Sequence, residues 1–176
     1  GSNNQAVSVS EKEIVSIMVN EEDHLRIQAM QSGLTLLETW RIIDRIDDEV
    51  GKKLTYAYSA TWGYLTACPT NVGTGMRASV MVHLPSLVMT KQIDKVLQSI
   101  AKLSLTARGF YGEGTEASGN FFQISNQVSL GRSEEEIIDN IERIIKQVIE
   151  YEQNTREALV TQNKEALEDR VWRAYG

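Results

Sequence analysis

The irregular order of strand-like and helix-like segments constrains the fold of this chain more than any other feature of its sequence. Alternating or β-branched residues predict strands over residues 14–19, 25–30, 77–84, 103–107 and 121–125. Apolar residues at helical intervals predict helices over residues 35–53, over residues 93–100 and from residue 133 onward. Because these segments show no regular strand–helix–strand repeat, we expect an α+β fold, in which a largely antiparallel sheet is flanked by helices.

Two of the predicted helices begin with a sequence that is typical of helix N-termini. Thr35 is followed by Glu38, and Ser133 by Glu136, at the spacing of a capping box. The second box opens a long C-terminal helix whose apolar stripe consists of Ile137, Ile141, Ile144, Ile145 and Val148. The stripe then weakens, and we expect the helix to continue, broken or bent, towards Trp172.

Composition argues against several classes of protein. The 176 residues carry a net charge of −6 and no run of lysine or arginine, which disfavours broad nucleic-acid binding, because such binding rests on neutralising many phosphates. No apolar run approaches the roughly 18 residues that would indicate a membrane span. The single cysteine, Cys68, rules out an internal disulfide framework and fits a reducing compartment, so we expect a cytoplasmic protein.

The domain organisation is simple. Gly1 and Ser2 are interpreted as a cleavage scar, and residues 1–13 as this scar together with an N-terminal lead-in. Residues 14–176 contain no repeat, no low-complexity tract and no obvious linker, so we expect them to form one domain.

Three polar clusters flank or interrupt the predicted strands, at residues 20–26, 68–79 and 108–116. Taken singly, they could be an acidic turn in solvent, an inert small cysteine and a Gly-rich loop. Together they offer Arg26, Arg77 and Arg108, whose planar guanidinium groups bind phosphate oxygens in pairs and would suit a triphosphate. Glutamates beside such a site would repel phosphates, so we expect them to hold a cation. A guanidinium is the natural candidate, since a carboxylate pairs with it through two hydrogen bonds.

The sequences of these clusters resemble three signature blocks of the phosphagen (guanido) kinase family. The blocks read NEEDHLRIQAM, CPTNVGTGMRASVMVHLP and RGFYGEGTEASGNFFQISNQ, and they occur in order between about Val15 and Gly131. The amino-acid sequences of these blocks and of the tail LEDRVWRAYG are most similar to those of the bacterial protein arginine kinases. The resemblance implies that residues 14–176 have the glutamine-synthetase-like fold of the guanido kinase C-terminal catalytic domain.

The resemblance also implies catalytic roles. Glu22 would contact the substrate guanidinium and act as the base, Glu113 would hold the other side of that group, and Cys68 would lie near the reacting nitrogens. Creatine-type members lack the second glutamate, so its presence favours an arginine-like substrate. A guanidinium is protonated at neutral pH, and a carboxylate must therefore accept the departing proton. Asp23 and His24 are interpreted as structural residues that orient the turn around Glu22.

A nucleotide site is implied in the same way. Arg26, Arg77 and Arg108 match the arginines that clamp the phosphates of ATP. The other positions that match the lining of the nucleotide site are Ala78, Ser79, Val80, Met81, Gly109, Phe110, Tyr111, Gly112 and Glu113. We expect Mg²⁺ to bind through oxygens of the nucleotide, since this cation prefers phosphate and water to a cage of protein ligands.

Two positions or motifs depart from the family pattern. Met81 stands where animal members carry a histidine that packs on adenine, and the upstream SxRxR motif, which supplies further phosphate-binding arginines, is missing from this sequence. We therefore expect the chain to be a fragment that is inactive or weakly active alone. His83, in the same predicted strand as Met81, is interpreted as a histidine satisfied within the core.

Three functions stay open. The first is ATP-dependent phosphorylation of arginine in proteins, with ATP and arginine-bearing proteins as partners. The second is a small-molecule guanidino kinase that acts on free arginine. The third is a non-catalytic nucleotide-binding or dimerisation module, for which the long helix and the missing upstream arginines argue; a homodimer would fit this alternative. Neither nucleic acid nor a membrane is expected as a partner.

Overall fold

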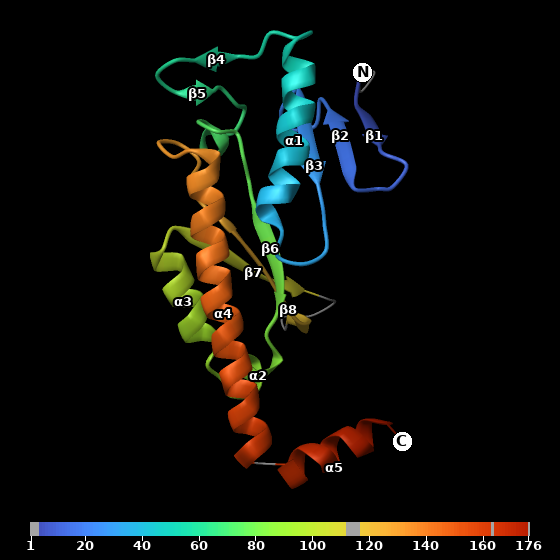
Figure 1. Cartoon of the computed structure of the whole chain (residues 1–176), viewed down its shortest axis with the longest axis vertical. Helices are drawn as coiled ribbons and strands as arrows, with labels where there is room; N and C mark the ends of the chain where they lie inside the picture. Colours follow the sequence, from blue (N-terminus) through green and yellow to red (C-terminus); the bar gives the residue numbers. More distant parts are fainter. Residues whose placement is uncertain (1–3, 112–116, 163, 176) are drawn as a thin grey trace. The chain divides into compact units, whose positions relative to one another are not determined.

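The computed structural model of the chain describes residues 4–111, 117–162 and 164–175 (Figure 1). The chain divides into two compact units, each built from two separate stretches of sequence. The first unit consists of Gly1–Ala78 and Asn126–Glu142, and the second of Ser79–Ser125 and Arg143–Gly176. The long helix α4 (Glu134–Gln162) begins in the first unit and ends in the second.

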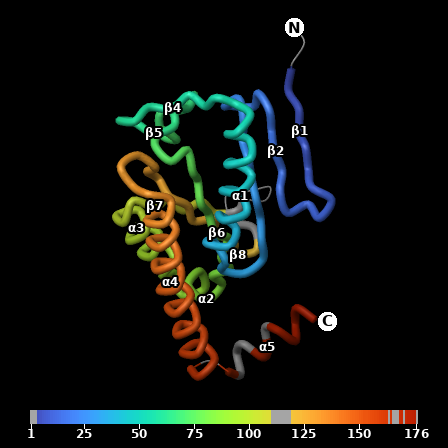
Figure 2. The backbone as a smooth tube through the Cα atoms, turned by 45° about the horizontal axis from the view of Figure 1, so that its top comes forward, coloured from blue at the N-terminus to red at the C-terminus, as the bar shows by residue number. Residues whose placement is uncertain are grey.

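A three-stranded antiparallel sheet in the order β1-β2-β3 belongs to the first unit. Its strands are β1 (Ala6–Val9), β2 (Val15–Val19) and β3 (Leu25–Ala29), which lie side by side in Figure 2. Helix α1 (Leu36–Gly51) follows and contacts β3. Strand β1 falls within the stretch that the sequence analysis treated as a scar and lead-in, so this stretch contributes a strand to the sheet.

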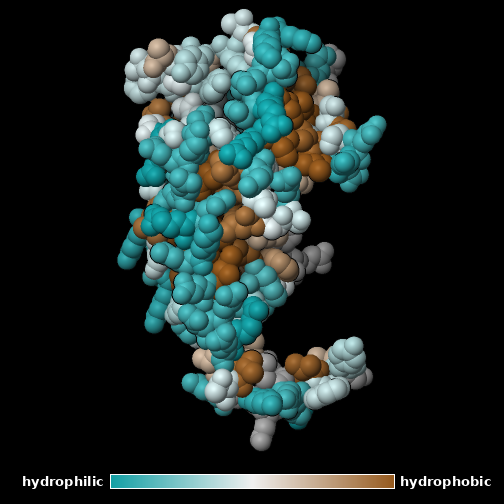
Figure 3. All heavy atoms as spheres, in the orientation of Figure 1, coloured by the Kyte–Doolittle hydropathy of each residue, from teal (hydrophilic) through white to brown (hydrophobic). Residues whose placement is uncertain are grey.

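The first unit leaves part of its apolar surface in contact with solvent. Every residue of β2 is partly exposed, and Figure 3 shows hydrophobic residues gathered over β2 and β3 beside α1. Deep burial in this unit occurs at the start of α4, where Ile137, Ile138 and Ile141 are buried. The apolar stripe expected for the long helix therefore does form a core.

A short hairpin and a 3₁₀ turn occupy much of the segment between α1 and the next sheet. Strands β4 (Tyr58–Ser59) and β5 (Gly63–Tyr64) pair antiparallel, and the turn η1 spans Pro69–Asn71. The Tyr64 hydroxyl donates a hydrogen bond to the Asp47 carboxylate of α1 at 3.3 Å, which ties the hairpin to that helix. Residues 61–76 are thus mostly irregular, with short ordered elements among them.

The second unit contains a sheet in the order β6-β8-β7. Strands β6 (Ser79–His83), β7 (Leu105–Tyr111) and β8 (Ala117–Asn126) form it, and β6 pairs antiparallel with β8, so that His83 lies opposite Phe121. The helices are α2 (Pro85–Met89), α3 (Ile93–Lys102), which contacts β7, and α5 (Lys164–Tyr175). Its core residues are Val82, Leu84, Leu87, Val96, Ile100, Leu105, Phe122, Ile124, Ile144, Ile145 and Val148.

The expected α+β fold is confirmed, with antiparallel strands, flanking helices and a long C-terminal helix. The strands of the described residues form three sheets, whereas one sheet was expected. The cluster at residues 108–116, which alone could be a Gly-rich loop, begins inside a strand, because β7 continues to Tyr111. Helix α2 was not predicted, since its five residues are too few to show a helical period.

The two predicted capping boxes had different outcomes. At α4 the box is present: the Glu136 N–H donates to Ser133 Oγ at 3.2 Å, and the Ser133 N–H donates to the Glu136 carboxylate at 3.0 Å. At α1 the prediction was wrong, because in the described structure Thr35 makes no side-chain cap hydrogen bond. Its carbonyl accepts a hydrogen bond from the Thr39 hydroxyl at 2.8 Å instead.

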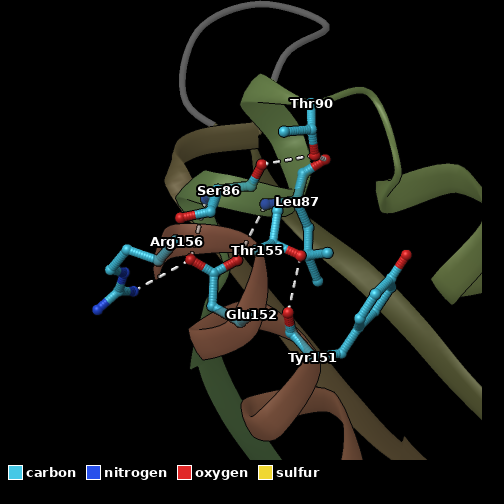
Figure 4. Close-up of polar contacts among 7 residues, drawn as sticks. All are labelled: Ser86, Leu87, Thr90, Tyr151, Glu152, Thr155 and Arg156. Atoms are coloured by element: carbon cyan, nitrogen blue, oxygen red, sulfur yellow. Dashed lines mark hydrogen bonds and ion pairs between the residues drawn. The ribbon is translucent and has the colours of Figure 1, made fainter. Parts of the chain in front are cut away.

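A buried carboxylate joins α4 to α2 within the second unit (Figure 4). Glu152 is 3% exposed and accepts hydrogen bonds from the backbone N–H groups of Ser86 and Leu87, at 2.9 and 3.0 Å. Arg156, one turn further along α4, donates to the same carboxylate at 3.0 Å. The first N–H groups of a helix have no partner within that helix, so Glu152 satisfies groups of α2 that would otherwise be buried unpaired.

These hydrogen bonds also set the ionisation of Glu152. Burial raises the pKa of this carboxyl, but hydrogen bonds from the Ser86 and Leu87 backbone, the Ser86 side chain and Arg156 outweigh burial and lower the pKa from its ordinary value. Glu152 is therefore held in its charged form.

Replacing Glu152 should destabilise the fold. Glu152→Gln keeps the shape of the side chain but removes its charge and one acceptor, and should lower the free energy of unfolding by about 1–3 kcal/mol. Urea denaturation followed by circular dichroism measures the change. Glu157→Gln, an exposed change on the same helix, is the matched control and should stay within about 0.5 kcal/mol of the original chain. Equal stability of the two variants would contradict the structural role of Glu152.

The contribution of Glu152 should depend on pH in a defined direction. Its folded pKa lies below the ordinary value of 4.5, so its stabilisation is complete above that pH and is lost as the pH falls through the folded pKa. The difference in unfolding free energy between the original chain and Glu152→Gln should therefore narrow in acid. Urea titrations between neutral pH and about pH 3 test this. A difference that widens in acid would mean that the folded pKa is raised.

Candidate functional site

The first polar cluster forms a tight turn between β2 and β3. The Asn20 N–H donates to the His24 carbonyl at 3.0 Å, and Asn20 has a φ of 54°, in the left-handed region that asparagine tolerates better than most residues. The Asn20 side chain also donates to the Asn4 carbonyl at 2.7 Å. Glu22 lies exposed on this anchored turn.

Asp23 connects this turn to the cysteine segment. Its carboxylate accepts a hydrogen bond from the Ala67 N–H at 2.6 Å, across 44 positions of sequence. Ala67 directly precedes Cys68, so the structure brings the segments that carry Glu22 and Cys68 together within the first unit. This contact agrees with the interpretation of Asp23 as a structural residue of the turn.

Arg26 forms an ion pair that the sequence analysis did not foresee. Its guanidinium lies 3.2 Å from the Glu21 carboxylate, and both side chains are about half exposed. A hydrogen bond from the Glu22 backbone and then Arg26 itself lower the pKa of Glu21. Exposed pairs of this kind are weak, and arginine has five donors, so Arg26 could still bind phosphate oxygens.

Cys68 lies at the start of the η1 turn. It is half-buried, and its Sγ lies 2.9 Å from the Thr70 hydroxyl. The Thr66 hydroxyl donates to the Cys68 carbonyl at 2.7 Å. The thiol is therefore half-buried beside one hydroxyl group in a loop, whereas an inert structural cysteine would lie in the apolar core.

Arg77 is exposed, but the backbone on either side of it is anchored by a buried asparagine. Asn126 accepts a hydrogen bond from the Ala78 N–H at 2.8 Å and donates to the Met76 carbonyl at 3.1 Å. Asn126 falls in the third sequence block, where the analysis gave it no role. In the sequence, only its place in a block that matches the family's motifs could have drawn attention to Asn126.

The remaining predicted site residues belong to the second unit. Ser79, Val80 and Met81 lie in β6, Arg108 and Gly109 in β7, and Phe110 and Tyr111 at the end of β7. Arg108 is exposed. Gly112 and Glu113 lie outside the described residues. The roles of these residues therefore stay predictions.

His83 was misplaced by the sequence analysis. It is exposed and stacks on Phe121, with ring centroids 4.7 Å apart and planes at 24°. Alternation along β6 puts His83 on the same face as Met81, which is 52% exposed, while Val82 points into the core. The interpretation as a core histidine is wrong, because the apolar neighbours in sequence lie on the opposite face of the strand.

Within residues 4–111, 117–162 and 164–175, no group of three or more His, Cys, Asp or Glu side chains could hold a metal ion. No helix in that part of the chain is both long and apolar enough to cross a membrane.

Comparison with known proteins identifies the family. The model of the ATP:guanido phosphotransferase C-terminal catalytic domain matches residues 1–155. The chain belongs to this family. The resemblance that the three sequence blocks suggested is thereby confirmed, and the match also includes strand β1.

Relatives within the family are protein-arginine kinases. The chain is 59% identical to that of Pelotomaculum thermopropionicum over 172 residues, which cover 98% of this chain and 48% of the relative. The protein-arginine kinase of Bacillus subtilis is 52% identical over 168 residues, 96% of this chain and 46% of the relative. The chain thus spans about half the length of the relatives it matches.

Solved structures of other guanido kinases share the fold. A lombricine kinase matches with a TM-score of 0.78 and 30% identity, over 89% of this chain and 44% of that one. The duplicated taurocyamine kinase of Schistosoma mansoni, with bound transition state analog components, matches with a TM-score of 0.75 and 34% identity, over 87% of this chain and 21% of that one.

The contact between Asp23 and Ala67 generates a prediction. In Asp23→Ala the Ala67 N–H loses its acceptor, so its amide hydrogen should exchange faster with solvent, by about tenfold for a hydrogen bond of ordinary strength. Asp23→Asn keeps an oxygen that can accept this bond and serves as the matched control. Hydrogen exchange followed by NMR or mass spectrometry measures both. Unchanged exchange at Ala67 in Asp23→Ala would show that the contact does not hold the segment.

Proposed function

We propose that the full-length protein containing this chain transfers the γ-phosphoryl group of ATP to a guanidinium nitrogen of arginine residues in other proteins. The observation that carries the proposal is the identity of 59% to a protein-arginine kinase over 98% of the chain. The hydrogen bond from Ala67 to Asp23 supports it, because it joins the segments of Glu22 and Cys68. The catalytic domain would include β1 as well as residues 14–176.

The proposed chemistry assigns the proton to Glu22. The protonated guanidinium has no free lone pair on the attacking nitrogen, so the Glu22 carboxylate would accept a proton as that nitrogen bonds to the γ-phosphorus. The bond from this phosphorus to the bridging oxygen breaks, and ADP leaves with the electron pair. Glu113 would align the guanidinium plane from its other side, and Cys68 would contact the reacting nitrogens.

The phosphates would be held by arginines. The transition state of phosphoryl transfer is loose, so alignment and neutralisation of charge supply most of the acceleration. Arg26, Arg77 and Arg108 are exposed, and each carries five N–H donors with which it could bind phosphate oxygens. Mg²⁺, bound through nucleotide oxygens, would neutralise further charge. The remaining lining of the nucleotide site would be Ala78, Ser79, Val80, Met81, Gly109, Phe110, Tyr111, Gly112 and Glu113.

A second function is favoured by the structural neighbours, whose names are lombricine kinase and taurocyamine kinase. These names raise the alternative that this protein phosphorylates a small guanidino compound such as free arginine. The two functions differ in the acceptor of the phosphoryl group, which is an arginine residue of a protein in the first and a small guanidino compound in the second. The cytoplasmic location and a homodimer stay predictions.

An assay of the full-length protein tests the proposed function. With MgATP, it should form acid-labile phosphoarginine, detected by ³¹P NMR, on an arginine-containing protein and much less on free arginine. Transfer to free arginine alone would favour the small-molecule kinase. Binding of MgATP without transfer to either acceptor would favour a non-catalytic module.

Glu22→Gln should abolish most of this activity. Loss of the base should lower kcat by about 10²–10⁴-fold while the melting temperature stays close to that of the original protein. Glu11→Gln, an exposed change in the same unit, is the matched control and should leave kcat unchanged. Turnover in Glu22→Gln at the rate of the original enzyme would remove Glu22 from the role of base.

A further inference from the structure

We propose that Asn126 and Ser129 are positioning residues, which hold the loop of residues 68–78 in the shape that presents Cys68 and Arg77. The two residues belong to a stretch, residues 126–130, that we call the template segment. The inference rests on the proposed function for the roles of Cys68 and Arg77. The contacts that carry it all lie within the first unit.

Asn126 acts on the Arg77 end of the loop. It is 7% exposed, and its amide oxygen accepts from the Ala78 N–H at 2.8 Å while its amide nitrogen donates to the Met76 carbonyl at 3.1 Å. The same nitrogen donates to the Val128 carbonyl at 3.3 Å, which fixes the amide itself. One side chain thus holds the backbone on both sides of Arg77 and leaves the guanidinium exposed.

Ser129 acts on the Cys68 end. It is 2% exposed, and its hydroxyl oxygen lies 3.0 Å from the Thr70 carbonyl and 2.9 Å from the Val72 carbonyl. A serine hydroxyl has a single proton, so it donates to one of these carbonyls at a time. The contacts fix the η1 turn that follows Cys68, and the Thr70 hydroxyl in turn lies 2.9 Å from the Cys68 thiol.

The middle of the loop lies directly against the template segment. Gly73 has a φ of +111°, and a Cβ built on it would lie 2.7 Å from both Leu130 Cα and the Ser129 carbonyl oxygen. The Thr74 N–H also points to the Ser129 carbonyl, at 3.5 Å. The loop and the segment therefore touch backbone to backbone, and no side chain could be inserted between them without moving one of them.

The pattern of these contacts indicates positioning as well as stability. A buried amide with both a donor and an acceptor can pair a backbone N–H and a backbone carbonyl at once, which an apolar side chain of similar size could not do. The hydrogen bonds of Asn126 to the loop end on the two neighbours of Arg77. The contacts of the Ser129 hydroxyl end in the turn after Cys68. Misplacement of a reacting group by about 1 Å can cost about 10²-fold in rate, so phosphoryl transfer would be sensitive to the shape of this loop.

The Arg77 end is tested by a double-mutant cycle in the full-length protein. Asn126→Asp preserves shape and the acceptor for Ala78 but loses the donor to Met76 and Val128, and should raise the Kd for MgATP by about tenfold in calorimetry. In the background of Arg77→Ala, which raises the Kd by itself, Asn126→Asp should have little further effect, because it acts through Arg77. Additive effects, or an unchanged Kd in Asn126→Asp, would overturn the proposal for Asn126.

The Cys68 end is tested without any catalytic readout. Ser129→Ala should release the η1 turn and speed the alkylation of Cys68 by iodoacetamide by about tenfold, measured on the Cys68 peptide by mass spectrometry. Gln127→Ala, an exposed change in the template segment, is the matched control for both ends and should change neither the Kd nor the alkylation rate. An unchanged rate in Ser129→Ala would overturn the proposal for Ser129.

Melting temperatures separate these outcomes from a purely structural role. If the variants of Asn126 and Ser129 lower the melting temperature but leave Kd and alkylation unchanged, or if they fail to fold altogether, the residues are structural and the proposal is wrong. The alkylation arm does not depend on kinase activity. A full-length protein without phosphoryl transfer but with faster alkylation in Ser129→Ala would contradict the proposed function and leave the positioning of Cys68 standing.

Discussion

Hydrogen bonds from side chains to backbone N–H and C=O groups hold the irregular parts of this structure in place. A loop cannot satisfy its own polar groups as a helix or sheet does, and each group that is buried unpaired costs free energy. Among the described residues, Asp23 does this for Ala67, Asn126 for Met76 and Ala78, Ser129 for Thr70 and Val72, and Glu152 for the start of α2. Each joins segments at least 44 positions apart in sequence.

This constraint changes how the signature blocks of the guanido kinases are understood. The blocks contain residues proposed for chemistry, such as Glu22 and Arg77, but also residues whose contacts end on backbone. Asp23 follows Glu22 directly, and Asn126 is the penultimate residue of the block that begins at Arg108. A block of this kind therefore contains both the proposed reacting groups and the residues whose polar contacts shape the loops around them.

The sequence predicts the regular elements well and the loop contacts poorly, for a physical reason. The capping box at Ser133 and the isoleucine stripe of α4 are local patterns, so they could be recognised without coordinates. Strand β1 was missed although Val7 and Val9 alternate with smaller residues, because four exposed residues are too short a pattern to predict a strand. The roles of Asn126 and Ser129, and the exposure of His83, depend on which distant segment packs beside them, and no spacing in the sequence contains that information.

The close approach at Gly73 limits how this loop can diverge between relatives. Where two backbones touch, the path of the chain is fixed by the atoms that every amino acid shares, and selection can act only on side chains that point away from the contact. Side chains at exposed positions such as Thr70 could therefore be exchanged, while an insertion beside Gly73 would have to move both backbone segments of the contact at once. In this part of the molecule, side chains can therefore change while the path of the loop backbone stays the same.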